Sequence, residues 1–135
     1  MLKQKIGYDF DGVLCTEQKG WFNDLMWKLF PKWWAIQVHK RAQYTGIVPE
    51  SGSIIITGRM GGECWFTEEQ LRKWNIKESF LFIDIVKDFP DKQASIVFKK
   101  DTIRQLHISI FHENDDETIK ELEKTFKGEL TIIKH

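Results

Sequence analysis

The sequence contains few of the residues that build metal clusters or disulfide frameworks. It has two cysteines, Cys15 and Cys64, which lie far apart and form no CxxC pair, and its four histidines form no HExxH motif. A disulfide-stapled fold and a zinc site are therefore not expected. No uninterrupted apolar run approaches the length that spans a bilayer, so no membrane segment is expected either.

A surplus of charge of one sign is also missing. Lysine and arginine together number 20, as do aspartate and glutamate, so the formal net charge at pH 7 is zero. This balance favours neither nucleic acid nor an anionic membrane as a partner. Internal repeats and interdomain linkers are lacking too, and 135 residues suffice for one domain with a hydrophobic core. A first strand expected from about residue 5 leaves no room for a signal peptide, so we expect a cytoplasmic protein.

The stretch from Ile6 to Leu14 carries the first chemical signal. An apolar run ends at Asp9, and Asp11 and Gly12 follow. Residues two positions apart in a strand point to the same side, so the two carboxylates would lie together at the carboxyl end of a strand. Ligands of open α/β sheets bind at that edge, where two carboxylates can divide nucleophilic and proton-transfer roles. The alternative is an Asp-Gly turn that merely ends the strand.

A second signal follows the β-branched run from Ser53 to Thr57. This run is too short for a helix and predicts a strand buried on both faces. It ends in Thr57-Gly58-Arg59, and a hydroxyl, a glycine that lets backbone come close, and a cation together suit a phosphate group. The alternative is a glycine turn with Arg59 on the surface.

Two adjacent lysines lie beside the apolar stripe of a helix predicted from about residue 92 to 106. Lys99 and Lys100 follow Ile96 by three and four residues, so they flank the stripe that Ile96 shares with Ile103 and Leu106. Burying an unpaired ammonium group is costly, so a lysine on that side predicts an anionic partner. The spacing does not separate Lys99 from Lys100, so both are candidates. The alternative is a lysine whose stem runs along the surface.

An acidic segment follows the fourth predicted strand, at residues 107–112. Most of its side chains carry oxygen ligands: Glu113, Asn114, Asp115, Asp116 and Glu117. Acidic side chains here favour the N-terminus of the helix predicted to reach about residue 126, or they supply ligands for Mg²⁺. A last strand is predicted at residues 130–133.

Residues 21–50, which we call the insertion, separate the first two predicted strands. Apolar residues recur there at helical spacing and Pro31 divides them, so two helices are predicted, at 21–30 and 31–44. The insertion is rich in tryptophan, interleaved with basic residues. Such a helix pair packs on the sheet with its basic residues in solvent, or it forms a lid whose aromatic side chains stack on a substrate base. A membrane-surface role is the least favoured, because the aromatic residues are not confined to one long helix.

The remaining segments complete an alternating order of strands and helices. Thr67 to Gln70 matches a capping box, which predicts a helix from Glu68 to about Asn75. A third strand is predicted at residues 79–85. Strands that alternate with helices predict a parallel sheet with right-handed crossovers.

Together these patterns resemble the four motifs of the haloacid dehalogenase (HAD) superfamily, in order and over nearly the whole chain. Asp9-Phe10-Asp11-Gly12-Val13-Leu14 resembles motif I, Thr57-Gly58-Arg59 motif II, Phe98-Lys99 motif III, and Glu113-Asn114-Asp115 a variant of motif IV. The resemblance implies a single α/β domain over residues 1–135, a Rossmann-like three-layer sandwich. Its five-stranded parallel sheet would have the order 5-4-1-2-3, with helices on both faces and residues 21–50 as a minimal cap.

The resemblance also implies catalytic roles. Asp9 would be the nucleophile that forms an aspartyl-phosphate, and Asp11, with a pKa raised toward neutrality, would transfer protons. The phosphoryl group would be bound by the remaining residues of motifs II and III: Thr57, the backbone N–H of Gly58, Arg59, and Lys99 or Lys100.

A Mg²⁺ cofactor is implied as well. Its ligands would be the Asp9 carboxylate, the backbone carbonyl of Asp11, and Glu113 or Asp115. Asn114 stands where most members of the superfamily have an acid, which leaves open which of Glu113, Asn114 and Asp115 binds the metal.

The expected activity is Mg²⁺-dependent hydrolysis of a phosphomonoester. A proton-transferring Asp11 favours phosphoester hydrolysis over dehalogenation, because a halide leaving group needs no proton. The small cap leaves the site open for a nucleotide or another phosphorylated small molecule, or for a nucleic-acid end, since the layout loosely resembles polynucleotide 3′-phosphatase domains. Asn114 suggests the alternative of a non-catalytic HAD-like binding or regulatory module.

Overall fold

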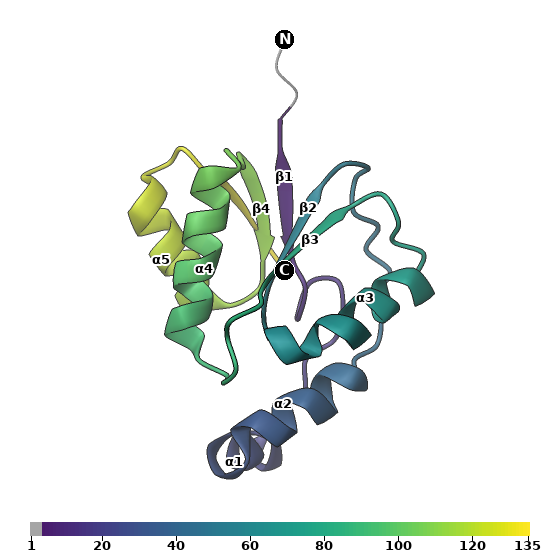
Figure 1. Ribbon diagram of the computed structural model, residues 1–135. Coiled ribbons are helices and arrows are strands. Elements are labelled where there is room, and N and C mark those ends of the chain that lie inside the picture. The colour runs from purple at the N-terminus through teal and green to yellow at the C-terminus, as the bar shows by residue number, and fades with distance from the viewer. Residues whose placement is uncertain (1–3) are drawn as a thin grey trace.

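The computed structural model describes residues 4–135, so the first three residues of the expected domain lie outside the described part (Figure 1). The strands are β1 (Ile6–Asp9), β2 (Ile54–Met60), β3 (Phe80–Asp84), β4 (Ile110–Glu113) and β5 (Thr131–Lys134). The α-helices are α1 (Trp21–Leu29), α2 (Pro31–Lys40), α3 (Cys64–Lys73), α4 (Lys92–Gln105) and α5 (Asp116–Phe126), and a 3₁₀ turn, η1 (Gly61–Glu63), precedes α3.

The five strands form one parallel sheet in the order β3-β2-β1-β4-β5. This is the predicted order 5-4-1-2-3 seen from the other edge. Helices α4 and α5 lie on one side of the sheet and α3 on the other (Figure 1). The predicted Rossmann-like α/β fold is therefore confirmed.

Two hydrophobic clusters, one on each face, hold the sheet between its helices. Strand β2 divides its side chains between them: Ile55 joins the cluster of Phe10 and Leu71, whereas Ile54 and Ile56 join the other cluster. This alternation follows from the two-residue period of a strand. The predicted burial of β2 on both faces is confirmed, because all three isoleucines are buried.

The insertion lies beyond the carboxyl ends of the strands (Figure 1). Its two helices meet at Pro31, the first residue of α2, as predicted. The second helix ends at Lys40 rather than at residue 44. The reason is that the following backbone pairs with the segment after β1 instead: the Thr16 N–H donates to the Gln43 carbonyl, and the Thr45 N–H donates to the Leu14 carbonyl.

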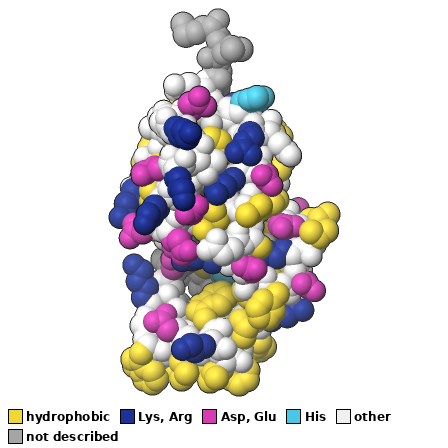
Figure 2. All heavy atoms as spheres, turned by 90° about the vertical axis from the view of Figure 1, so that its left-hand side faces the viewer, with side chains coloured by type: hydrophobic (Ala, Val, Ile, Leu, Met, Phe, Trp, Pro, Cys, Tyr) yellow, Lys and Arg dark blue, Asp and Glu magenta, His cyan; other side chains and the backbone are white. Residues whose placement is uncertain are grey.

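Hydrophobic side chains gather at the end of the insertion farthest from the sheet (Figure 2). None of the nine residues of α1, all of them within the described chain, is buried. Large hydrophobic side chains exposed on α1, on α2 and between them include Trp21, Phe22, Leu29, Phe30 and Trp33. None of the helices in residues 4–135 has both the length and the apolar character needed to cross a bilayer.

The starts of α3 and β4 also differ from the prediction. Helix α3 begins at Cys64, not at Glu68, and Thr67 lies buried inside it rather than capping it. The preceding turn starts the helix early, because the Glu63 carboxylate accepts the backbone N–H of Met60. Strand β4 begins at Ile110, not at residue 107, because His107 adopts a left-handed conformation with φ 53° that ends the preceding turn.

Candidate active site

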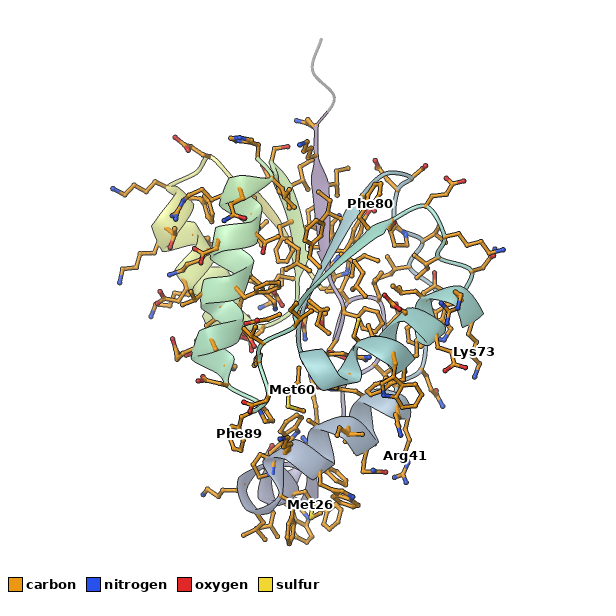
Figure 3. The ribbon with its side chains drawn as sticks, in the orientation of Figure 1. Met26, Arg41, Met60, Lys73, Phe80 and Phe89 are labelled. Atoms are coloured by element: carbon orange, nitrogen blue, oxygen red, sulfur yellow. The ribbon has the colours of Figure 1, made fainter. Side chains whose placement is uncertain are left out.

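A pocket of about 340 Å³ opens at the carboxyl ends of β1, β2 and β4. The sheet register places these strand ends side by side, since Tyr8 of β1 pairs with Ile55 of β2 and with His112 of β4. Met60, at the end of β2, lies on the side of the core that faces the insertion (Figure 3). Most of the predicted site residues line this catalytic pocket: Asp9, Asp11, Gly58, Arg59, Lys99, Glu113, Asn114 and Asp115.

Two of the predicted residues lie elsewhere. The side chain of Thr57 is fully buried, and its hydroxyl accepts a hydrogen bond of 3.1 Å from the backbone N–H of Arg59, so it shapes the turn that ends β2. Lys100 points away and pairs with Glu121 of α5 at 3.5 Å. Of the two adjacent lysines, Lys99 is the one in the catalytic pocket.

Lys99 lies buried between two carboxylates. Its Nζ is 3.1 Å from Asp9 and 2.9 Å from Glu113, which satisfies the sequence-based expectation of an anionic partner. Burial alone would lower the pKa of Lys99, but the charges of Asp9 and Glu113 raise it above its usual value. Burial, together with the charge of Glu113, raises the pKa of Asp9 against the opposing effect of Lys99. The three groups carry one surplus negative charge when all are ionised.

Glu113 orients this lysine. Its Oε2 accepts the hydrogen bond from Lys99, while its Oε1 accepts the backbone N–H groups of Asn114 and Asp115 at 3.0 and 3.2 Å. Since both oxygens of this fully buried carboxylate already have partners, Glu113 holds Lys99 in place and is poorly suited to the predicted role of metal ligand.

Asp115 is occupied as well. Its Oδ2 accepts hydrogen bonds from the backbone N–H and the hydroxyl of Thr118, which lies in the first turn of α5, and its Oδ1 pairs with Lys92 at 3.0 Å. The helix-terminus alternative for the acidic segment therefore describes Asp115 in this structure. Asp115 is no better placed than Glu113 to bind a metal.

Asn114 has the one side-chain oxygen of this segment that lacks a partner while buried. Its Nδ2 donates to Glu17 at 3.1 Å, whereas its Oδ1 is buried and has no hydrogen-bond partner among residues 4–135. Gly12 makes room for this amide, because a Cβ on Gly12 would lie 2.1 Å from Asn114 Nδ2.

These contacts test the fit of Mg²⁺. The described residues contain no group of three or more His, Cys, Asp or Glu side chains arranged to hold a metal ion. Mg²⁺ usually takes one or two carboxylates and completes its shell with water and substrate phosphate. The unpartnered Asn114 Oδ1, together with the Asp9 carboxylate and the Asp11 carbonyl, fits that pattern. Of the three candidates Glu113, Asn114 and Asp115, Asn114 is therefore the one whose side-chain oxygen fits this ligand set.

Arg59 turns into the protein instead of toward solvent. It is fully buried, its Nε and Nη2 donate to the Asp11 carboxylate at 3.0 and 2.8 Å, and its guanidinium lies 4.1 Å from the centre of the Phe10 ring. Its Nη1 donates to Thr67 and Gln70 of α3 at 2.9 and 2.6 Å. With these partners, Arg59 positions Asp11 and is not free for the substrate contact that the sequence suggested.

This arrangement reverses the expectation for Asp11. Burial alone would raise the pKa of Asp11, but the charge of Arg59, with that of His39 and the Arg59 hydrogen bonds, lowers it well below its usual range. The prediction of a pKa raised toward neutrality is therefore wrong for this structure. The pattern Asp-Phe-Asp does not reveal a guanidinium that comes from a residue 48 positions later.

His39 of α2 is a site residue that sequence reasoning missed. Its Nε2 lies 3.6 Å from Asp11 Oδ2, and its Nδ1 is hydrogen-bonded to Glu63, a fully buried carboxylate in η1. Nothing in the spacing of His39 and Glu63 signals this contact, since they come from the insertion and from a glycine-containing turn. The insertion thus contributes a side chain to the catalytic pocket.

Lys87 was missed as well. It lies in the loop after β3, and its Nζ donates to the Gly58 carbonyl at 2.9 Å and contacts Ser95 of α4. Burial lowers the pKa of Lys87, although Asp91 and Asp84 oppose the shift. Gly58 is needed at this close approach, because a Cβ there would lie 2.6 Å from Ser95 Oγ.

The comparisons with known proteins leave the site to be interpreted from its own geometry. No protein-family model matches the chain, and neither curated proteins nor solved structures include a match to it. What the site can do chemically follows from its buried charges and their place in the fold. A buried carboxylate, Asp9, lies beside a buried ammonium, Lys99, and both line a pocket at the carboxyl edge of a parallel sheet.

Proposed function

We propose that this chain is a phosphomonoester hydrolase of the haloacid dehalogenase type, with Asp9 as its nucleophile. The observation that carries the proposal is the buried Asp9–Lys99–Glu113 group at the carboxyl edge of β1 and β4. The Lys99 ammonium favours the ionised form of Asp9 and offers a phosphate group an oppositely charged partner. The motif resemblance points to the same three residues.

The positions of these groups support attack by Asp9 on the phosphorus of a phosphomonoester. A phosphate in the catalytic pocket meets Lys99 and the backbone N–H of Gly58, which offset its charge and orient it. An Asp9 oxygen forms a bond to phosphorus as the bond from phosphorus to the ester oxygen breaks, leaving an aspartyl-phosphate and an alcohol. Mg²⁺ held by Asp9, the Asp11 carbonyl and Asn114 would supply further neutralisation of the phosphate charge.

Asp11 is the general base of the proposed reaction. Because Arg59 keeps this carboxylate ionised, it accepts the proton of the water that hydrolyses the aspartyl-phosphate. With its pKa held this low, Asp11 releases that proton to solvent before the next turnover, and the leaving alcohol takes its proton from solvent water. Arg59 and His39 hold Asp11 in position throughout this cycle.

Hydrolysis of p-nitrophenyl phosphate, with Mg²⁺ and with a chelator, tests the proposal. We expect Mg²⁺-dependent turnover, and we expect Asp9→Asn to reduce kcat by at least about a thousand-fold, as loss of a covalent nucleophile does in other enzymes. Asp88→Asn, an acid outside the pocket, is the matched control. Equal rates for the wild type and Asp9→Asn would overturn the proposal.

A non-catalytic phosphate-binding module is the second candidate. It is favoured by the engagement of both Glu113 and Asp115 in protein contacts, which leaves Asn114 with the only buried side-chain oxygen of that segment that has no partner in residues 4–135. This function predicts that inorganic phosphate binds the chain, measured by isothermal titration calorimetry, while no phosphomonoester is hydrolysed. Turnover that depends on Asp9 would exclude it.

A further inference from the structure

A second cavity of about 460 Å³ adjoins the catalytic pocket, between the insertion and the loop that follows β1. Six residues line both cavities, so the two are continuous: Asp11, Glu17, Trp27, His39, Lys92 and Asp115. Figure 2 shows the surface hollowed between the body of the molecule and the insertion. Under the proposed function, on which this inference rests, a phosphate in the catalytic pocket would direct its alcohol into this side pocket.

The charged groups of the side pocket are mainly acidic. Glu17 and Asp24 contribute carboxylates that form no ion pair within residues 4–135. The one lysine of the lining, Lys92, is already paired with Asp115 and Glu117 at 3.0 and 3.2 Å. Like charges that face each other across an interface repel and weaken binding. A leaving group that carries further phosphates is therefore disfavoured here.

The side pocket also offers an aromatic surface. Trp27 is half-buried, with its ring centre 6.0 Å from that of His39. Asn23 is not free to bind a ligand, because both ends of its amide have partners in the protein. Its Oδ1 accepts a hydrogen bond from Trp34 at 2.9 Å, and its Nδ2 donates to the Gln18 carbonyl at 3.1 Å. When they are ionised, the carboxylates of Glu17 and Asp24 can accept hydrogen bonds but not donate them. A suitable ligand presents a ring face and hydroxyl or amino donors.

From this geometry we infer that the side pocket selects an uncharged, ring-bearing alcohol such as a nucleoside, and rejects polyanionic leaving groups such as a polynucleotide. Trp27 contacts the ring, and Glu17 and Asp24 accept its hydrogen bonds and repel additional phosphate groups. The cavity volume lies within the range of about 300–1,000 Å³ that small-molecule ligands occupy. The nucleic-acid-end substrate suggested by the sequence is thereby disfavoured.

The inference is tested by comparing adenosine 5′-monophosphate with a 5′-phosphorylated oligonucleotide and with adenosine 3′,5′-bisphosphate. We expect kcat/KM for the monophosphate to exceed the other two by at least about tenfold. In the variant carrying Glu17→Gln and Asp24→Asn this ratio should fall toward one. The control pair Glu68→Gln and Asp88→Asn, which lies outside both cavities, should leave the ratio unchanged. Equal kcat/KM values for all three substrates in the wild type would overturn the inference.

Adenosine itself tests the side pocket without turnover. We expect it to bind the wild-type chain in isothermal titration calorimetry and to bind Trp27→Ala about tenfold more weakly, whereas Trp65→Ala, an exposed tryptophan outside both cavities, should bind like the wild type. If adenosine binds but no phosphomonoester is hydrolysed, the proposed activity fails and the side pocket stands. If p-nitrophenyl phosphate is hydrolysed through Asp9 but adenosine does not bind, only the side-pocket inference fails.

Discussion

At the scale of single residues, Lys99 is the cation that contacts both Asp9 and Glu113, the two buried carboxylates on either side of it. Its ammonium offsets only one of the two carboxylates that it touches, and Glu113 is the better satisfied of them because two backbone N–H groups also serve it. The negative charge of Asp9 is consequently the less well compensated of the two, so ionised Asp9 destabilises the folded chain. Active-site groups that destabilise the folded chain are expected where reactivity is needed.

Asp9→Asn should therefore increase stability while it abolishes turnover. The raised pKa of Asp9 means that its ionisation opposes folding above that pKa, since burial penalises the charged form. The variant should gain about 1 kcal/mol in the free energy of unfolding at pH 7. The gain should shrink as the pH falls through the folded-state pKa, because wild-type Asp9 then becomes neutral too.

Urea unfolding of both proteins in chelator-containing buffer, from pH 5 to pH 8, measures this difference. Lys99→Met provides the contrasting variant, because it leaves Asp9 and Glu113 buried without their cation and should cost about 3–5 kcal/mol. An Asp9→Asn chain less stable than the wild type at pH 7 would mean that ionised Asp9 stabilises the fold rather than straining it.

At the scale of the elements, Gln70 links three segments of the chain. Its Oε1 accepts from Arg59 at the end of β2, and its Nε2 donates to the His39 carbonyl at the end of α2 at 2.7 Å. The stacking of Tyr44 on Trp74, with ring centres 5.4 Å apart, is a further attachment of the insertion to the core. Helix α3 thus supports both the ion pair of Asp11 and the placement of the insertion.

Replacing Gln70 with alanine should destabilise the chain by about 1–3 kcal/mol, because a buried guanidinium N–H and a backbone carbonyl each lose a partner. Thermal or denaturant unfolding measures the change, and Gln105→Ala, an exposed position near the end of α4, is the control with almost no expected effect. An equal decrease in the free energy of unfolding in the two variants would show that the Gln70 contacts stabilise the chain no more than an exposed side chain does.

The sequence predicts the positions of strands and helices better than it predicts the partners of their side chains. The β-branched run of β2 and the apolar stripe of α4 each depend on local periodicity, and both elements lie where the sequence places them. The partners of Arg59 and His39 depend on which way long side chains turn after distant segments have packed. The pKa direction of Asp11 follows from those partners, so no local pattern contains it.

At the scale of the whole molecule, the insertion is supported from its inner side only. Trp34 is buried and donates a hydrogen bond to Asn23, whereas Trp21 at the outer end is 78% exposed. The apolar outer end therefore adds little to the stability of the isolated chain. The inner contacts keep α1 and α2 beyond the carboxyl ends of the strands (Figure 1), where Trp27 and His39 line the catalytic pocket.

Trp34→Ala should accordingly cost about 3–5 kcal/mol, as truncation of a buried aromatic side chain does. Trp21→Lys should change the free energy of unfolding by no more than about 0.5 kcal/mol, which is typical of surface substitutions. Urea unfolding followed by circular dichroism distinguishes the two variants. A large loss in Trp21→Lys would mean that the outer end has a structural partner within the chain.

The parallel pairing of β1 also has a consequence for synthesis on the ribosome. Asp9 precedes Lys99 by 90 residues and Glu113 by 104 residues. At translation rates of about 5–20 residues per second, the two partners follow Asp9 out of the ribosome by about 5–20 seconds. During that interval the nascent chain cannot form the buried Asp9–Lys99–Glu113 group, and strand β1 cannot yet pair with β4. The catalytic pocket is thus completed only late in synthesis, after the insertion and α3 have already emerged.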